Sequence, residues 1–337
     1  MKIFEDYLKP IRDAIASDPK AHRTNINLSA RNQNFTKTFS LKNFNEQLPE
    51  KRLLPSLEDF ARTIGLVPDF DQELGLHPDF VHLQHSEVLE NHYIVSMFVD
   101  IKGSTNLFRK YTPQTVWLIT NTIQRAAIHT CLIFGGYVHR LQGDGLFVYF
   151  GRKGMTEALA IQRSLQFSSV FSYFVKEDLK NIFSEQGIER IYTRIGVDLG
   201  YDADVVWGMA GIGKISEITT CSLHTSLASK MQSNAISNGI VIGDNVKKES
   251  SGLAEFYTPV CARTEDERDR YIFQIPEENF NYTQYDFDWL RFLKKQDFIA
   301  TDLAGRLQLK SRATVLNNRN PAYMAPIAIA SKPYYNF

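Results

Sequence analysis

Two aspartates lie at the ends of strand-like segments, where their carboxylates could take part in metal-assisted chemistry. Asp100 follows the apolar run that starts at Tyr93, a predicted buried strand that breaks at this residue. Asp144 lies in the turn 143–145, Gly-Asp-Gly, between two further strand-like runs, which is a strong hairpin signal. Either aspartate alone is typical of a plain turn. If the hairpin lies beside the Asp100 strand, the two carboxylates meet, and an oxygen cluster of this kind suits Mg²⁺ or Mn²⁺ carrying a polyphosphate.

Two glycine-containing loops are candidates for holding phosphate. The loop after Asp100 can turn its backbone amides toward a phosphate ahead of a helix, and its residues are Lys102, Gly103, Ser104 and Thr105. The second loop, 208–214, matches the phosphate-loop spacing G-x-x-x-x-G-K, but Ile215 stands where that motif needs Ser or Thr. The next residues are also β-like, so a glycine-rich turn between strands is favoured over a phosphate loop.

Three further side chains are candidates for contacting a substrate. Ser226 and Lys230 are four residues apart on a predicted helix, so they share one face, which is either simply solvated or a binding face. Arg140 lies in the first hairpin strand, either as a surface residue or as a hydrogen-bond donor that reads a base. The eight His residues show no HExxH spacing, and the three Cys residues no CxxC pair, so neither a zinc site nor a disulfide framework is predicted.

Composition excludes several classes of protein. The 337 residues are 43% hydrophobic and 23% charged, which predicts a packed globular protein. Lys plus Arg equals Asp plus Glu at 38 each, so there is no basic excess for a nucleic-acid partner. The first residues lack the apolar region of a signal peptide, and no run approaches the roughly 18 apolar residues of a membrane span. We expect a soluble, cytoplasmic protein with no membrane or nucleic-acid partner.

The elements predicted around these residues suggest one main domain with two extensions. Predicted helices cover 3–15 (with a kink or restart at Pro10), 56–65 (capped by Ser56), 112–134 (capped by Thr112), 155–174, 177–183 and 223–232. Further predicted strands cover 191–200, 204–208 (a returning strand), 215–221, 239–243 (an inner strand) and 270–275 (the last strand), and 21–54 is predicted to be a loop. We place an N-terminal extension at 1–88, a catalytic domain at 89–277 and a C-terminal extension at 278–337.

The residues around the two aspartates resemble the catalytic core of the class III nucleotidyl cyclases. The similarity covers roughly residues 90–275 and rests on the Asp100 strand, the helix that ends at the glycine pair 135–136, and the hairpin 140–145. It implies an α+β protein with a ferredoxin-like βαββαβ sheet, in agreement with the predicted element order. It also implies that two divalent cations, Mn²⁺ or Mg²⁺, are held by Asp100, Asp144 and the carbonyl of Ile101.

The second half of the chain departs from the pattern of the purine cyclases. Where that family has Asn and Arg on the helix facing the partner subunit, this chain has Ser226 and Lys230, and its two base-reading positions match Arg140 and Thr219. These departures look similar to the pyrimidine cyclases of bacterial anti-phage (Pycsar) systems. The resemblance implies a homodimer with shared sites that converts UTP, slightly ahead of CTP, into a 3′,5′-cyclic nucleotide and pyrophosphate, with the product read by a separate effector protein. A purine cyclase and a catalytically inactive nucleotide sensor remain alternatives.

Overall fold

The fold is seen in a computed structural model of the chain, which describes residues 1–20, 52–185, 191–311 and 314–315. The predicted loop at 21–54 lies almost wholly outside these ranges, as does the end of the predicted C-terminal extension. None of the described helices is long and apolar enough to cross a membrane.

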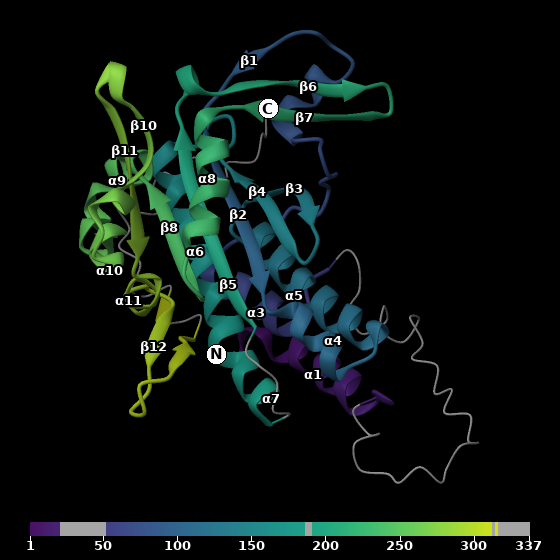
Figure 1. Cartoon of the computed structure of the whole chain (residues 1–337). Coiled ribbons are helices and arrows are strands. Elements are labelled where there is room, and N and C mark those ends of the chain that lie inside the picture. Colours follow the sequence, from purple (N-terminus) through teal and green to yellow (C-terminus); the bar gives the residue numbers. More distant parts are fainter. Residues whose placement is uncertain (21–51, 186–190, 312–313, 316–337) are drawn as a thin grey trace, which may run out of the picture.

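One large sheet forms the centre of the molecule (Figure 1). Its strand order is β10-β11-β8-β5-β2-β4-β3, and β9 (Tyr257–Pro259) also pairs with β11. The strands are β10 (Tyr271–Ile275), β11 (Phe280–Phe287), β8 (Gly239–Gly243), β5 (Tyr192–Gly200), β2 (Ile94–Lys102), β4 (Gly145–Phe150) and β3 (Tyr137–Gln142). β5 and β8 pair in parallel, whereas β2 is antiparallel to both of its neighbours.

The predicted ferredoxin-like core is confirmed by the connectivity. β2 leads into α5 (Pro113–Ile133), the β3–β4 hairpin follows, and α6 (Glu157–Tyr173) leads into β5, which gives βαββαβ. These four strands lie in the order β5-β2-β4-β3, so the first strand is central and pairs with the last. Thr112 caps α5 as predicted, because its side chain accepts a hydrogen bond from the amide of Thr115, and Pro113 occupies the first helical position.

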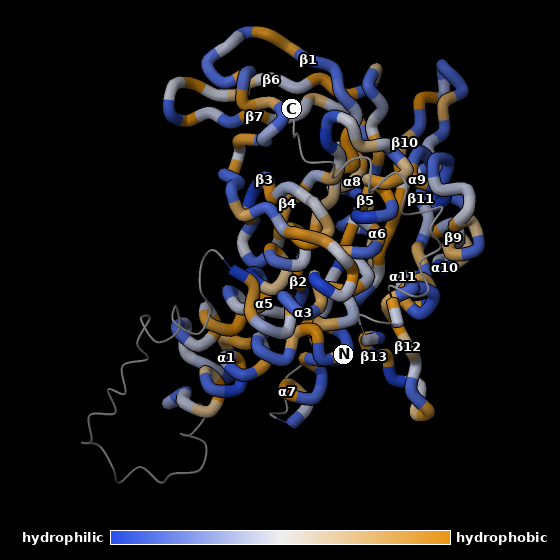
Figure 2. Tube along the Cα trace, turned by 180° about the vertical axis from the view of Figure 1, so that it is seen from behind, coloured by the Kyte–Doolittle hydropathy of each residue, from blue (hydrophilic) through white to orange (hydrophobic). Residues whose placement is uncertain are grey.

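The two faces of the sheet are covered differently. Because strand residues alternate between faces, Val95, Met97 and Val99 join the main hydrophobic core with α5 and α6. The helices α1 (Glu5–Ala16) and α3 (Pro55–Ile64) add residues to the same core. Figure 2 shows these elements from behind, with hydrophobic and hydrophilic residues interspersed along the chain. The opposite face carries a single long helix, α8 (Leu223–Asn234), which packs on β5 and β2 (Figure 1). Asp100 belongs to this second face, since it alternates with Val99.

A hairpin arm extends beyond the main sheet. β6 (Val206–Ile212) and β7 (Ile215–Cys221) pair with each other, and β1 (Glu90–Asn91) adds a third strand (Figure 1). The prediction of a returning strand at 204–208 is therefore wrong, because β6 pairs with β7 and β1 instead of the main sheet. Gly211 and Gly213 adopt positive φ at the tip, and a strand follows them where a phosphate loop would need a helix. The glycine-rich turn that the sequence favoured is confirmed.

Several predicted boundaries need correction. β2 does not end at Asp100 but continues to Lys102, because β5 pairs with it along that whole length. Ser56 is not the cap of α3, which begins at Pro55 after Leu54. Pro10 neither breaks nor restarts α1, which runs through it without interruption. The remaining helices and strands are α4 (Leu107–Lys110), α7 (Leu179–Glu185), α9 (Asp244–Glu249), α10 (Cys261–Thr264), α11 (Trp289–Lys294), β12 (Ile299–Thr301) and β13 (Leu307–Leu309).

The strand at 270–275 is not the last one, as the sequence had suggested. β11 follows it and pairs with both β10 and β8, so it is an interior strand of the sheet. The predicted domain boundary at residue 277 falls between β10 and β11, two paired strands of one sheet.

Candidate active site

The β3–β4 hairpin lies next to the end of β2, so the fold brings Asp100 and Asp144 close together. Val99 pairs with Leu146 across the β2–β4 ladder, which places the hairpin turn beside Asp100. A Cβ atom added to Gly145 would lie 2.3 Å from the carbonyl oxygen of Val99 and 3.4 Å from the Cα of Asp100. Only glycine therefore permits this close approach of the turn to β2. The convergence of carboxylates expected from the sequence is present.

The Asp144 carboxylate is held in a partly desolvated position. Burial raises the pKa of Asp144, a hydrogen bond with Ser104 opposes this, and the negative charge of Asp100 raises the pKa further. Among the described residues, the Oδ2 atom of Asp144 is buried without a hydrogen-bond partner. A buried carboxylate oxygen without a donor is costly unless a cation or another ligand satisfies it.

These donors fit a divalent cation in part. Asp100, Asp144 and the buried Ile101, whose carbonyl accepts a 3.5 Å hydrogen bond from the Ser104 hydroxyl, offer hard oxygen ligands of the kind Mg²⁺ and Mn²⁺ prefer. The described part of the chain contains no group of three or more His, Cys, Asp or Glu side chains placed to hold a metal. A cation here would therefore need further oxygen ligands from water or from a substrate phosphate, which Mg²⁺ commonly has.

Arg194 is a site residue that sequence reasoning missed. It lies opposite Asp100 in the β2–β5 ladder, and its Nε and Nη2 atoms donate to Asp100 Oδ2 at 3.1 and 2.5 Å. Both groups are partly exposed, at 25% for Arg194 and 33% for Asp100, so the pair remains accessible from solvent. The cross-strand register could have revealed it, but a single sequence does not say which strands pair.

The loop after Asp100 leads into a helix, as its sequence predicts. Lys102 is exposed at the end of β2, and Gly103 adopts φ of +93° before a short 3-10 turn, Ser104–Asn106, that continues into α4. Ser104 reaches back to Asp144. The proposed contacts of Lys102, Gly103, Ser104 and Thr105 with phosphate stay a prediction.

Arg140 is engaged by a carboxylate from the arm. Its Nε donates to Oε2 of Glu217 at 2.6 Å, and a second ion pair joins its Nη2 to Oε1. Glu217 lies on β7 two residues before Thr219, so the two share one face of that strand. Glu217 is a second residue that the sequence analysis missed, and it holds Arg140 near the face of β7 that carries Thr219.

The α8 helix presents Ser226 and Lys230 on its exposed side, as the four-residue spacing predicts. The ammonium of Lys230 lies 5.9 Å from the centre of the Phe273 ring on β10. β10 is at one edge of the sheet, and the β3–β4 hairpin with Asp144 is at the other. Within one chain, the fold therefore brings Asp100 and Asp144 together but directs Lys230 away from them.

Comparison with known proteins identifies relatives of this chain. The chain is 36% identical over 272 residues to a cytidylate cyclase of Staphylococcus aureus, a match that covers 77% of this chain and 61% of that protein. A cytidylate cyclase of Escherichia coli is 33% identical over 213 residues, covering 61% of this chain and 46% of that protein. The chain is a relative of the cytidylate cyclases. The resemblance to class III cyclases, and among them to those acting on pyrimidine nucleotides, is thereby confirmed.

The chain itself spans less than two thirds of the length of these two curated proteins. No family model matches the chain. Among solved structures, the adenylyl cyclase CyaB from P. aeruginosa is similar with a TM-score of 0.48 and 18% identity, over 59% of this chain and 95% of that chain.

Proposed function

We propose that the chain is a pyrimidine nucleotide cyclase, which converts CTP or UTP into the 3′,5′-cyclic monophosphate and pyrophosphate. The observation that carries this proposal is the buried, unpartnered oxygen of Asp144 beside Asp100, in a chain that is 36% identical to a cytidylate cyclase over 272 residues. The sequence alone placed UTP slightly ahead of CTP. The names of the two relatives favour CTP, so CTP is the first substrate to test.

The reaction is an in-line displacement at the α-phosphorus. The ribose 3′-hydroxyl forms the new P–O bond, pyrophosphate leaves with the electrons of the broken bond, and the hydroxyl proton passes to solvent. A divalent cation held by Asp100, Asp144 and the Ile101 carbonyl would supply charge neutralisation at the triphosphate. Two such cations are part of the proposal, either Mn²⁺ or Mg²⁺.

The chain's own residues bind and orient the nucleotide. Lys230 places a positive charge near the phosphorus undergoing transfer, and the Ser226 hydroxyl one turn earlier faces the same side of the substrate. A single donor of this kind is typically worth about 3 kcal/mol, or roughly 100-fold in rate. Arg140, held by Glu217, offers its donors to a pyrimidine carbonyl, and Thr219 can both donate and accept on the base edge.

A homodimer with shared sites belongs to the same proposal. Lys230 leans toward β10, at the edge of the sheet remote from the Asp144 hairpin, so one chain alone does not assemble both halves. The arm tip supports a partner surface, because Ile212 and Ile215 are 80% and 82% exposed there. A second copy placed head to tail would bring its Lys230 to the aspartates of the first and form two equivalent sites.

The test is incubation of the protein with each of the four nucleoside triphosphates and Mn²⁺ or Mg²⁺, with identification of the products by mass. Cyclic CMP or cyclic UMP as the main product supports the proposal. Cyclic AMP or cyclic GMP as the main product would show a purine cyclase, and no cyclic product from any of the four would favour an inactive nucleotide sensor. A role in anti-phage signalling would then be tested by phage challenge of cells that carry the active and inactive forms.

A further inference from the structure

The segment Gly196-Val-Asp198-Leu-Gly200 on β5 has an unusual arrangement beneath α8. Alternation along the strand puts its two glycines and Asp198 on the face that α8 covers, and the intervening Val197 and Leu199 in the main core. A Cβ at Gly196 would lie 2.1 Å from the carbonyl oxygen of Ala228, so the helix backbone rests directly on the strand. The helix that carries Ser226 and Lys230 therefore has no layer of side chains separating it from β5 at this point.

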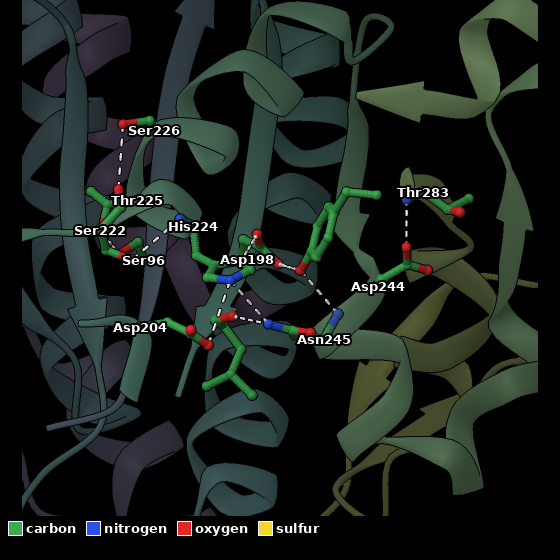
Figure 3. A network of polar contacts seen from close by, with 12 residues as sticks. Ser96, Asp198, Asp204, Ser222, His224, Thr225, Ser226, Asp244, Asn245 and Thr283 are labelled. Carbon is green, nitrogen blue, oxygen red and sulfur yellow. Dashed lines mark hydrogen bonds and ion pairs between the residues drawn. The ribbon is translucent and has the colours of Figure 1, made fainter. Parts of the chain in front are cut away.

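Asp198 is fully buried at the centre of this contact (Figure 3). The imidazole Nδ1 of His224, in the first turn of α8, lies 2.9 Å from Asp198 Oδ2, and the Tyr282 hydroxyl on β11 donates to Oδ1 at 2.7 Å. A Cβ at Gly243 would lie 2.2 Å from Asp198 Oδ1, so glycine leaves the room that the carboxylate occupies. The burial raises the pKa of Asp198, and the hydrogen bonds from His224 and Tyr282 lower it.

His224 and Tyr282 each contact further polar groups besides Asp198. The side-chain amide of Asn245 lies 3.3 Å from His224 Nε2 and donates to the carbonyl of Leu199 at 2.8 Å. His224 Nε2 also lies 3.8 Å from Asp204 Oδ2, so the imidazole lies between two carboxylates, with Nδ1 directed at Asp198. The Tyr282 hydroxyl accepts a hydrogen bond from the backbone N–H of Asn245 at 3.0 Å and donates its own proton to Asp198 Oδ1.

The first turn of α8 is also tied to two other strands. The Thr225 hydroxyl lies 2.8 Å from that of Ser96 on β2 and 3.1 Å from that of Thr220 on β7 of the arm. Ser222 caps the helix by accepting from the amide of His224 at 3.2 Å (Figure 3). This single turn thus joins β2, β5, the arm and, through Asp198 and Tyr282, the strand β11.

We propose that Asp198, His224 and Tyr282 are positioning residues that set the height and rotation of α8, and with them the place of Ser226 and Lys230 in the cyclase reaction. A buried charged network contributes little net stability compared with an apolar core, whereas it does specify one geometry. The proposal rests on the proposed function of Lys230 and Ser226. It also gives β11, which the sequence had assigned to an extension, a direct role in the placement of α8.

The test compares Tyr282→Phe with Tyr285→Phe, which removes a hydroxyl from the same strand. Tyr285 donates to Asp244 at 2.9 Å and makes no contact with Asp198 in the described hydrogen bonds. We expect Tyr282→Phe to lower kcat with little change in KM, by on the order of 10-fold, since a misplaced group costs rate more than binding. Tyr285→Phe should keep wild-type kcat. Equal effects of the two variants on kcat would overturn the proposal.

A second pair of variants separates positioning from bulk packing at His224. In His224→Asn the amide nitrogen lies near the place of Nδ1 and can still donate to Asp198, whereas His224→Gln carries its amide farther out, toward the place of Nε2. His224→Asn should therefore retain more of kcat than His224→Gln, and the reverse order would contradict the proposal.

Hydrogen exchange of the α8 amides gives a readout that does not need turnover. Tyr282→Phe should speed exchange in residues 223–234, and Tyr285→Phe should not. Unchanged α8 exchange in Tyr282→Phe would overturn the positioning role. If exchange responds as expected but the unmodified protein makes no cyclic product, the proposed function fails and the structural role of the network stands.

Discussion

At the scale of single residues, the proposed chemistry uses side chains whose burial destabilises the folded protein. Asp144 is the clearest case, because burial raises its pKa and one oxygen has no partner among the described residues. A carboxyl group whose pKa is raised by folding destabilises the folded protein when it is ionised at neutral pH. A ligand bound at Asp144 and Asp100 would offset this destabilisation.

Replacing Asp144 should therefore separate activity from stability. We expect Asp144→Asn to lose more than 90% of turnover, a barrier increase above about 1.4 kcal/mol, while its melting temperature equals or exceeds that of the wild type. Mn²⁺ should raise the melting temperature of the wild type and leave that of Asp144→Asn unchanged. Asp71→Asn, at an exposed carboxylate, is the control. A variant that keeps both turnover and the Mn²⁺ response would show that Asp144 is no metal ligand.

The Glu217 carboxylate holds the guanidinium of Arg140, so replacing Glu217 tests whether Arg140 reads the base. In Glu217→Gln the guanidinium loses its ionic partner, and we expect the preference for CTP and UTP over ATP to fall while the melting temperature changes little, since a partly exposed pair contributes about 0–1 kcal/mol. Glu255→Gln, which breaks ion pairs to Arg291 and Lys295, serves as the matched control. The measurement is kcat/KM for all four nucleotides. Equal proportional losses for the four would assign Arg140 to a structural role.

His139, next to Arg140, is fully buried, and neither ring nitrogen has a hydrogen-bond partner among the described residues. Burial, together with the charge of Arg140, lowers the pKa of His139 to about 3, so the folded protein keeps it neutral where the unfolded chain, with a pKa of about 6.5, binds a proton. Stability is therefore lost as the pH falls below about 6.5. Between pH 7 and pH 5 the wild type should lose about 2 kcal/mol more than His139→Phe, measured by urea unfolding. Parallel pH profiles would contradict the lowered pKa.

At the scale of elements, the sequence predicted local features better than it predicted which strands pair. The Thr112-Pro113 start of α5 and the Gly-Asp-Gly turn are properties of a few neighbouring residues, and the structure has both. The pairing of β1 with β6 in the arm and the strand β11 were missed because the partners lie far away in sequence, 41 or more residues for the β11–β8 pairs and 115 or more for the β1–β6 pairs. Arg194 and Glu217 were missed for a related reason, since Arg194 meets Asp100 through strand pairing and Glu217 meets Arg140 through a side-chain contact between two sheets. The residues that the sequence did find are those with distinctive local motifs.

The contact of α8 with β5 gives a prediction at this scale. Gly196→Ala would force a Cβ to within 2.3 Å of the Gln232 amide nitrogen, so the helix has to rise from the sheet. Overpacking of this kind costs about 1–3 kcal/mol, and we expect a lower melting temperature together with a lower kcat. Gly252→Ala is the matched control, because nothing lies within 4 Å of its added Cβ. A loss of stability without any change in kcat would show that catalysis does not depend on the present distance between α8 and the sheet.

At the scale of the whole molecule, the aspartates and Lys230 of one chain lie toward different sides of the main sheet. The aspartates are beside the β3–β4 hairpin, and Lys230 lies over Phe273 of β10. In the proposed reaction a monomer therefore keeps the two aspartates and Lys230 apart. A head-to-tail dimer resolves this, because each chain then lends its α8 to the aspartates of the other.

Mixing two inactive variants tests this arrangement directly. Asp100→Ala and Lys230→Ala should each be inactive alone, but a dimer containing one chain of each has one site in which Asp100 and Lys230 are both intact. Random exchange makes half of the dimers mixed, so the mixture should recover about a quarter of wild-type activity. The measurement is cyclic nucleotide formation after exchange, which is verified separately with two distinguishable tags. If exchange is complete and activity stays at the level of the separate variants, the aspartates and Lys230 act within one chain and the shared site is wrong.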